Sequence, residues 1–118
     1  MKISTMQNLL DAKVLCCEEK LEGDVYSACG CDLMSDVLAY VKDQAVLLTG
    51  LVNPQVIRTA VMMDMVCIVF VRSKTPSEEM LSLAKESGIV VMTTDKRLYE
   101  ACGLLYTNGL KGGCIEDV

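Results

Sequence analysis

The sequence contains no histidine, no tryptophan and only one phenylalanine, Phe70, among its 118 residues. Histidine is the most frequent general base, metal ligand and pH switch of proteins, so its absence removes the commonest way to build such sites. The motifs GxxxxGK[ST], GxGxxG and GxSxG are missing too, which excludes a P-loop and a nucleophile elbow. We therefore expect no enzyme of a recognised type, no catalytic residues and no cofactor.

Long apolar runs are also absent. The longest run that covers an expected strand is Met65–Val71, whereas a membrane span needs about 20 residues. The first residues lack the apolar segment of a signal peptide, so we expect a cytoplasmic protein with no membrane partner. The net charge is −5, and the 11 basic residues are scattered among 16 acidic ones, so direct nucleic-acid binding is not expected.

The seven cysteines are an odd number in a chain without a signal peptide, which argues for reduced thiols. Cys29 and Cys31 lie two residues apart and share one face if they are on a strand. A structural zinc or iron–sulfur site needs four ligands, and only Cys16-Cys17 offers a second pair. We expect Cys29 and Cys31 to be buried apolar thiols and expect no metal, with metal binding or a redox role as alternatives.

Apolar strand segments alternate with amphipathic helix segments along the chain. This alternation predicts an α/β fold over residues 1–110, a single domain with a mainly parallel sheet of about five strands and helices packed on it. Residues 111–118 are expected to form a flexible tail. The expected strands are residues 13–17, 25–31, 45–49, 65–71 and 89–92.

Capping residues predict where the helices begin, and apolar residues at helical spacing predict their buried faces. The predicted caps are Ser4 or Thr5, Asp32, Asn53 before Pro54, Thr75 in a capping box with Pro76 at the first helical position, and Thr94 or Asp95. The predicted ends include Gly88 and Asn108-Gly109. The predicted buried faces include Met34, Val37, Leu38 and Val41 in one helix and Val56, Ile57, Ala60 and Val61 in the next.

Ligands of open parallel sheets bind beyond the carboxyl ends of the strands, where helix N-termini point. Three loops are expected there: 49–53, 72–75 and 93–95. Their hydroxyls, cations and helix N-termini favour a small anionic or nucleotide-like ligand. The candidate ligand-binding residues are Thr49, Gly50, Asn53, Arg72, Ser73, Lys74, Thr93 and Thr94. The alternative is that these residues only cap helices and line solvated loops.

Asp32 and Asp36 are one helical turn apart, and paired carboxylates can act as acid and base. An N-cap role for Asp32, with Asp36 favoured by the same helix N-terminus, explains both residues more simply.

Four segments carry a resemblance to a known family. They are Asp32–Leu38, Leu48-Thr49-Gly50 with Asn53-Pro54, Ile68–Arg72, and Glu79–Ile89 with its Ala84 and Ser87-Gly88. Together they resemble the DRTGG domain and, through it, the N-terminal domain of HPr kinase/phosphorylase, from about Met1 to Leu110.

The resemblance implies an α/β fold and a regulatory role, because such domains also occur attached to CBS pairs and to phosphotransacetylase. The kinase activity of HPr kinase belongs to a separate P-loop domain that this chain lacks. The naming motif places Asp-Arg after the strand that ends near Thr49-Gly50, where this chain has Leu51-Val52. It places Thr-Gly-Gly after the next strand, where this chain has Val71-Arg72-Ser73, so no family site residue is carried over.

Three functions remain open. The leading hypothesis is a non-enzymatic regulatory or ligand-binding module that forms a homodimer, because the edges of a parallel sheet need cover. The second is an enzyme of unrecognised type that uses the loops at the strand ends. The third is an adaptor that binds other proteins in a redox or carbohydrate-regulatory complex.

Overall fold

The computed structural model describes residues 1–40 and 44–112. Five strands and five α-helices follow one another along the chain, with one short 3-10 helix, Glu18–Lys20, after the first strand. The strands are β1 (Lys13–Cys16), β2 (Ser27–Gly30), β3 (Ala45–Thr49), β4 (Cys67–Phe70) and β5 (Val90–Thr93). The helices are α1 (Ile3–Leu10), α2 (Met34–Tyr40), α3 (Pro54–Met62), α4 (Glu78–Ser87) and α5 (Leu98–Thr107).

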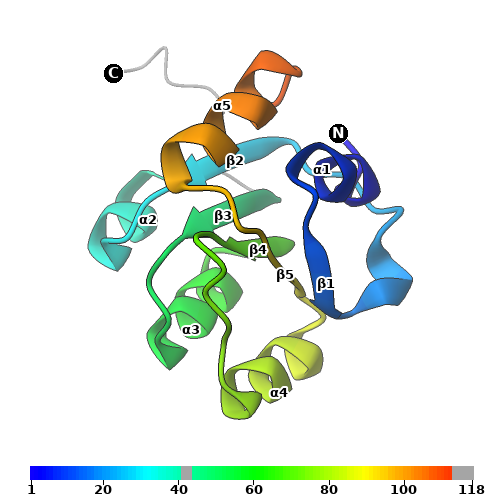
Figure 1. Cartoon of the computed structure of the whole chain (residues 1–118). Coiled ribbons are helices and arrows are strands. Elements are labelled where there is room, and N and C mark those ends of the chain that lie inside the picture. The colour runs from blue at the N-terminus through cyan, green and yellow to red at the C-terminus, as the bar shows by residue number, and fades with distance from the viewer. Residues whose placement is uncertain (41–43, 113–118) are drawn as a thin grey trace.

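The strands form one sheet in the order β1-β5-β4-β3-β2. β2, β3, β4 and β5 are parallel, and β1 pairs with β5 in the antiparallel direction. Helices α1 and α5 cover one face of the sheet, and α2, α3 and α4 cover the other (Figure 1). The predicted α/β fold with a mainly parallel five-stranded sheet is confirmed.

The core follows from the apolar strand segments. Every residue of β3 and β4 is buried, as expected for central parallel strands with helices on both faces. Phe70 is fully buried in β4 and is among the largest side chains of the core, which otherwise consists mainly of Val, Leu, Ile, Met and Ala. The loops that leave the carboxyl ends of the parallel strands are therefore attached to a well-packed core.

Several predicted caps are wrong. Ser77, not Thr75, caps α4: its hydroxyl accepts a hydrogen bond from Met80 N, so Pro76 precedes the helix. Arg97 is the N-cap of α5, where Thr94 or Asp95 was predicted. Asp32 does not cap α2, because its carboxylate bonds to another loop. Asn53 was predicted correctly, since its side chain accepts from Gln55 N.

Two predicted buried positions are wrong as well. Val61 is 47% exposed and Leu38 is 40% exposed, because each lies at the edge of its helix's apolar stripe. Val41 lies outside the described residues. Of the predicted tail, Lys111 accepts a hydrogen bond from Ala28 N on β2 (3.0 Å), and residues 113–118 lie outside the described part. No helix in the described ranges is long and apolar enough to cross a membrane.

Candidate functional site

Four loops leave the carboxyl ends of β2, β3, β4 and β5 at the same edge of the sheet, which we call the carboxyl rim. They comprise residues 31–33, 50–53, 71–77 and 94–97. The three loops predicted from the sequence therefore do meet at one edge. The loop after β2, which was not included in that prediction, joins them through Asp32.

Asp32 links the first two loops of the carboxyl rim. One of its carboxylate oxygens, Oδ1, accepts hydrogen bonds from the Thr49 hydroxyl and from Gly50 N, both at 2.8 Å. These two bonds hold the pKa of Asp32 below its usual range, and the nearby Arg72 guanidinium lowers it further. Asp32 therefore serves to hold the β3–α3 loop in place, and it does not share a helical face with Asp36 as predicted.

Arg72 lies directly over Gly50. A Cβ on Gly50 would stand 2.5 Å from a guanidinium nitrogen of Arg72, so any other residue at position 50 would displace the flexible end of Arg72. The guanidinium and the Asp32 carboxylate thus flank the same stretch of backbone. Their charges are close enough to influence each other, but they form no ion pair within 4.0 Å, and the only ion pair among residues 1–40 and 44–112 joins Lys2 to Glu22.

The loops after β4 and β5 are joined by three hydrogen bonds. Arg72 N donates to Lys96 O, and Ser73 N donates to Thr94 O, both at 2.8 Å. The Thr93 hydroxyl donates to Lys74 O at 2.7 Å. These bonds fix residues 72–75 and 94–97 side by side, and we call this unit the cationic loop pair.

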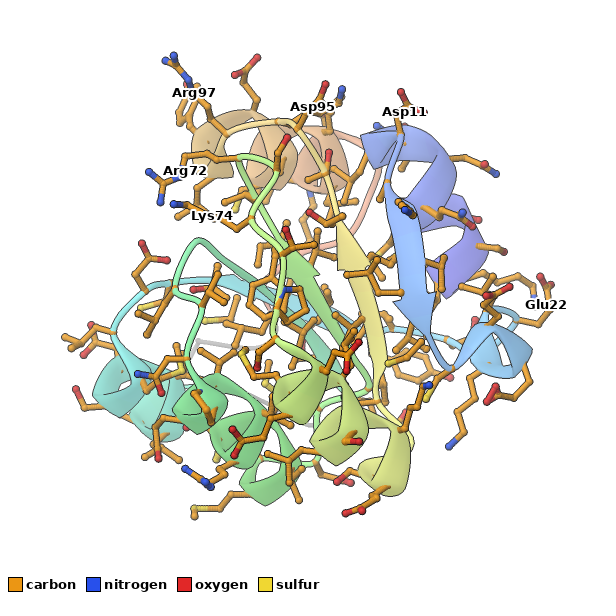
Figure 2. All side chains as sticks on the ribbon, turned by 60° about the horizontal axis from the view of Figure 1, so that its bottom comes forward. Asp11, Glu22, Arg72, Lys74, Asp95 and Arg97 are labelled. Carbon is orange, nitrogen blue, oxygen red and sulfur yellow. The ribbon has the colours of Figure 1, made fainter. Side chains whose placement is uncertain are left out.

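The cationic loop pair carries Arg72, Lys74, Lys96 and Arg97. Figure 2 shows Arg72, Lys74 and Arg97 on the same side of the molecule, with Asp95 at the same end. Arg72, Ser73, Lys74 and Arg97 are exposed. Four of the 11 cationic residues of an acidic protein thus lie in two adjacent loops, where they attract anions.

The predicted site residues divide into two groups. Thr49, Gly50, Asn53, Thr93 and Thr94 use their polar groups within the protein: Thr94, for example, is buried and donates to Leu10 O at 2.7 Å. The side chains of Arg72, Ser73 and Lys74 are exposed, with the Arg72 guanidinium lying over Gly50. Lys96 and Arg97 were missed, although they directly follow the predicted segment 93–95.

The thiols lie elsewhere. Cys102 Sγ lies over Gly30, where a Cβ would stand 2.5 Å away, so the alternating Cys29 and Cys31 face the opposite side of β2. Burial, with smaller contributions from Cys31 and Cys102, raises the pKa of Cys29 to about 11. Cys29, Cys31 and Cys102 are all half-buried. The described residues hold no group of three or more side chains arranged for a metal ion.

The Asp32 carboxylate gives the carboxyl rim a pH dependence. Because its pKa is lower in the folded than in the unfolded chain, its contribution to stability is present above the ordinary Asp pKa and is lost as the pH falls through the folded value. We expect Asp32→Asn to lower the free energy of unfolding by about 1 kcal/mol at pH 7 and by far less at pH 2. Urea denaturation at both pH values measures this difference.

Asp64→Asn is the matched control, because Asp64 is exposed and has a left-handed backbone (φ 54°) that asparagine also tolerates. It should leave stability nearly unchanged at both pH values. A loss in Asp32→Asn that is as large at pH 2 as at pH 7 would contradict the role given to the Asp32 charge.

The sequence profile of the DRTGG domain matches residues 5–107, and the chain belongs to this family. A similar solved structure is the crystal structure of the CBS and DRTGG domains of the regulatory region of Clostridium perfringens pyrophosphatase, complexed with its activator, diadenosine tetraphosphate. The two share 18% sequence identity at a TM-score of 0.71 over 88% of this chain and 45% of that one. This chain thus spans less than half of that structure, and no curated protein sequence matches it.

Two residues of the cationic loop pair have a backbone conformation that is related to the glycines of the family's naming motif. Arg72 and Ser73, which we expect from the sequence at the place of the motif's Gly-Gly, both have a left-handed backbone with φ 57°. Glycine adopts this conformation freely, whereas other residues do so at a cost. Arg72 and Ser73 therefore adopt a backbone conformation that glycine favours, and their side chains add a guanidinium and a hydroxyl group at this turn.

Proposed function

We propose that this domain is a regulatory module that binds a small ligand through phosphate groups, at the cationic loop pair. The observation that carries the proposal is that three hydrogen bonds hold the backbones of two loops side by side at the carboxyl rim, and these loops carry four cationic residues. A ligand with several negative charges would meet a preformed site, so little ordering would be needed to bind it. That the pyrophosphatase regulatory region is complexed with a phosphate-rich activator supports the same class of ligand.

We propose that the domain acts by binding and not by catalysis. Burial raises the pKa of each described thiol whose pKa is shifted. These thiols therefore stay protonated and are poor nucleophiles at neutral pH. The sequence has no histidine, and the Asp32 carboxylate is used to hold a loop. These features support a role in ligand sensing.

Contact with a second chain is the other candidate function, and one surface favours it. An apolar groove of about 430 Å³ lies between α3 and α4, lined by Ile57, Val61, Met62 and Leu83. Met62 is 70% exposed and its neighbour Val61 is 47% exposed, so the groove presents adjoining apolar side chains to solvent. The homodimer expected from the sequence stays a prediction, and this groove is where we propose that it forms.

The binding test uses inorganic tripolyphosphate, which carries the charge of a phosphate chain and nothing else. We expect isothermal titration at low salt to show binding to the wild-type chain and about tenfold weaker binding to Arg72→Gln, because one charge-assisted contact is lost. Low salt matters because exposed charges are screened over about 10 Å at 0.1 M.

Arg58→Gln is the control, since Arg58 is an exposed arginine on α3, away from the cationic loop pair. It should bind tripolyphosphate as the wild type does. Equal losses in Arg72→Gln and Arg58→Gln would mean that binding follows total charge only, and no heat with the wild type would end the proposal.

A further inference from the structure

Helix α5 carries a hollow that begins at the cationic loop pair. It has a volume of about 630 Å³, and the residues around it include Lys96, Tyr99, Glu100, Gly103, Tyr106 and Thr107. All of these residues lie on α5 or just before it, so the hollow is a shallow depression that is open to solvent. Lys96 belongs both to this hollow and to the cationic loop pair, where its carbonyl oxygen accepts from Arg72 N. The hollow and the cationic loop pair are therefore contiguous.

Gly103 forms the floor of the hollow, and the fold does not require a glycine there. A Cβ on Gly103 would meet no atom within 4 Å beyond its chain neighbours and its own helix backbone. Gly103 lies inside α5, where glycine is less favourable than alanine. Neither crowding nor a positive φ accounts for this glycine. What it does provide is space next to the helix backbone.

Two tyrosines stand on either side of that space. Tyr99 is 90% exposed and Tyr106 is 57% exposed, so both rings present large unburied faces. Lys111 Nζ lies 3.7 Å from the centre of the Tyr106 ring and orients it. Aromatic rings of this kind are platforms on which nucleobases stack, whatever their sequence. The Glu100 carboxylate borders the same space and can accept hydrogen bonds from the edge of a base. The Thr107 hydroxyl already donates to Gly103 O at 2.9 Å, so towards a ligand it can only accept.

We propose that this hollow binds the base of a nucleotide whose phosphates lie on the cationic loop pair. The inference rests on the proposed function and specifies its ligand class. Gly103 follows Arg97 by six positions, which corresponds to about 9 Å along a helix axis. A nucleoside polyphosphate has its negative charges and its aromatic ring at opposite ends, matching the cations at the start of α5 and the tyrosine-flanked hollow along it.

The test compares ATP with tripolyphosphate, because the two carry similar charge and only ATP has a base. We expect the wild-type chain to bind ATP about tenfold more tightly than tripolyphosphate. Gly103→Leu places a large side chain in the hollow, where its Cβ meets no atom within 4 Å, and should bring the affinity for ATP down to that for tripolyphosphate. Gly103→Ala is the control, because one methyl group leaves most of the hollow open and the difference should persist.

The outcomes separate this inference from the proposed function. If tripolyphosphate binds and ATP binds no better, the hollow is not a base site, while the cationic loop pair stands. If neither binds, both proposals are overturned. If Gly103→Leu leaves the affinity for ATP unchanged but converts a dimer to a monomer in sedimentation, the hollow receives a second copy of the chain and the base site is contradicted. Loss of ATP affinity in Gly103→Leu alone, with tripolyphosphate binding intact, supports it.

Discussion

Replacing Phe70 with alanine is expected to lower the free energy of unfolding by about 3–5 kcal/mol. Phe70 is the only phenylalanine, is fully buried in β4, and pairs with Thr49 of β3 and Thr93 of β5. The helices on both faces prevent the strands from closing the resulting cavity. Because small domains are stable by only about 5–15 kcal/mol, the variant should lose a large share of its stability, measured as a lower urea midpoint.

The control for Phe70→Ala is Tyr99→Ala, which also removes an aromatic ring but from a side chain that is 90% exposed. Its unfolding free energy should stay within about 0.5 kcal/mol of the wild-type value. A loss below about 1 kcal/mol in Phe70→Ala would contradict the packing described for the centre of the sheet.

Replacing both Arg72 and Ser73 with glycine should raise stability and weaken ligand binding in the same protein. Both residues have a left-handed backbone, which costs a non-glycine residue about 1–2 kcal/mol. After the greater chain entropy of glycine in the unfolded state is subtracted, we expect a net gain of about 1–2 kcal/mol. Loss of the Arg72 cation should weaken tripolyphosphate binding about tenfold or more. Urea denaturation and isothermal titration measure the two effects.

Ser73→Gly alone separates the two effects. It relieves one left-handed residue and leaves all four cations in place, so we expect about half of the stability gain and unchanged binding. A double variant that is less stable than the wild type would show that the side chains of Arg72 and Ser73 support the loop, and the interpretation of a strained functional turn would be wrong.

The sheet could be predicted because its strands are short apolar runs separated by helical patterns. The segments 45–49 and 65–71 are apolar enough to indicate central parallel strands, and the strands that form in them, β3 and the shorter β4, are buried throughout. β1 also appeared at its predicted place, but its antiparallel pairing with β5 could not be foreseen. Strand direction at a sheet edge depends on how the chain returns, which short local patterns do not encode.

Helix starts were harder to predict, because Ser, Thr, Asp and Asn serve equally in caps and in loops. Asn53 was identified because Pro54 follows it. In the segment Thr75–Glu78, both Thr75 and Ser77 fit a cap, and only the tertiary structure selects Ser77. Asp32 was misassigned for a similar reason: its hydrogen-bond partners, Thr49 and Gly50, are 17 and 18 residues further along the chain.

The position of the candidate site could be predicted from the sequence. Which of its side chains bond within the protein and which remain exposed could not be predicted. Parallel strands bring their carboxyl ends to one edge, so the loops at 49–53, 72–75 and 93–95 had to meet. Which polar groups bond inside the protein depends on distances that no spacing reveals. The signal for Gly103 was visible in the sequence, because an isolated glycine within a helical pattern often has a packing or functional reason.

The most direct test of the central claim is a titration of the ¹⁵N-labelled wild-type chain with tripolyphosphate, followed by amide chemical shifts. If the cationic loop pair is the binding site, the largest shifts will lie in residues 72–75 and 94–97, and they will saturate with a single dissociation constant. Shifts that are absent, or that scatter over remote cations such as Lys13 and Lys85 without saturating, would contradict a phosphate site at the carboxyl rim.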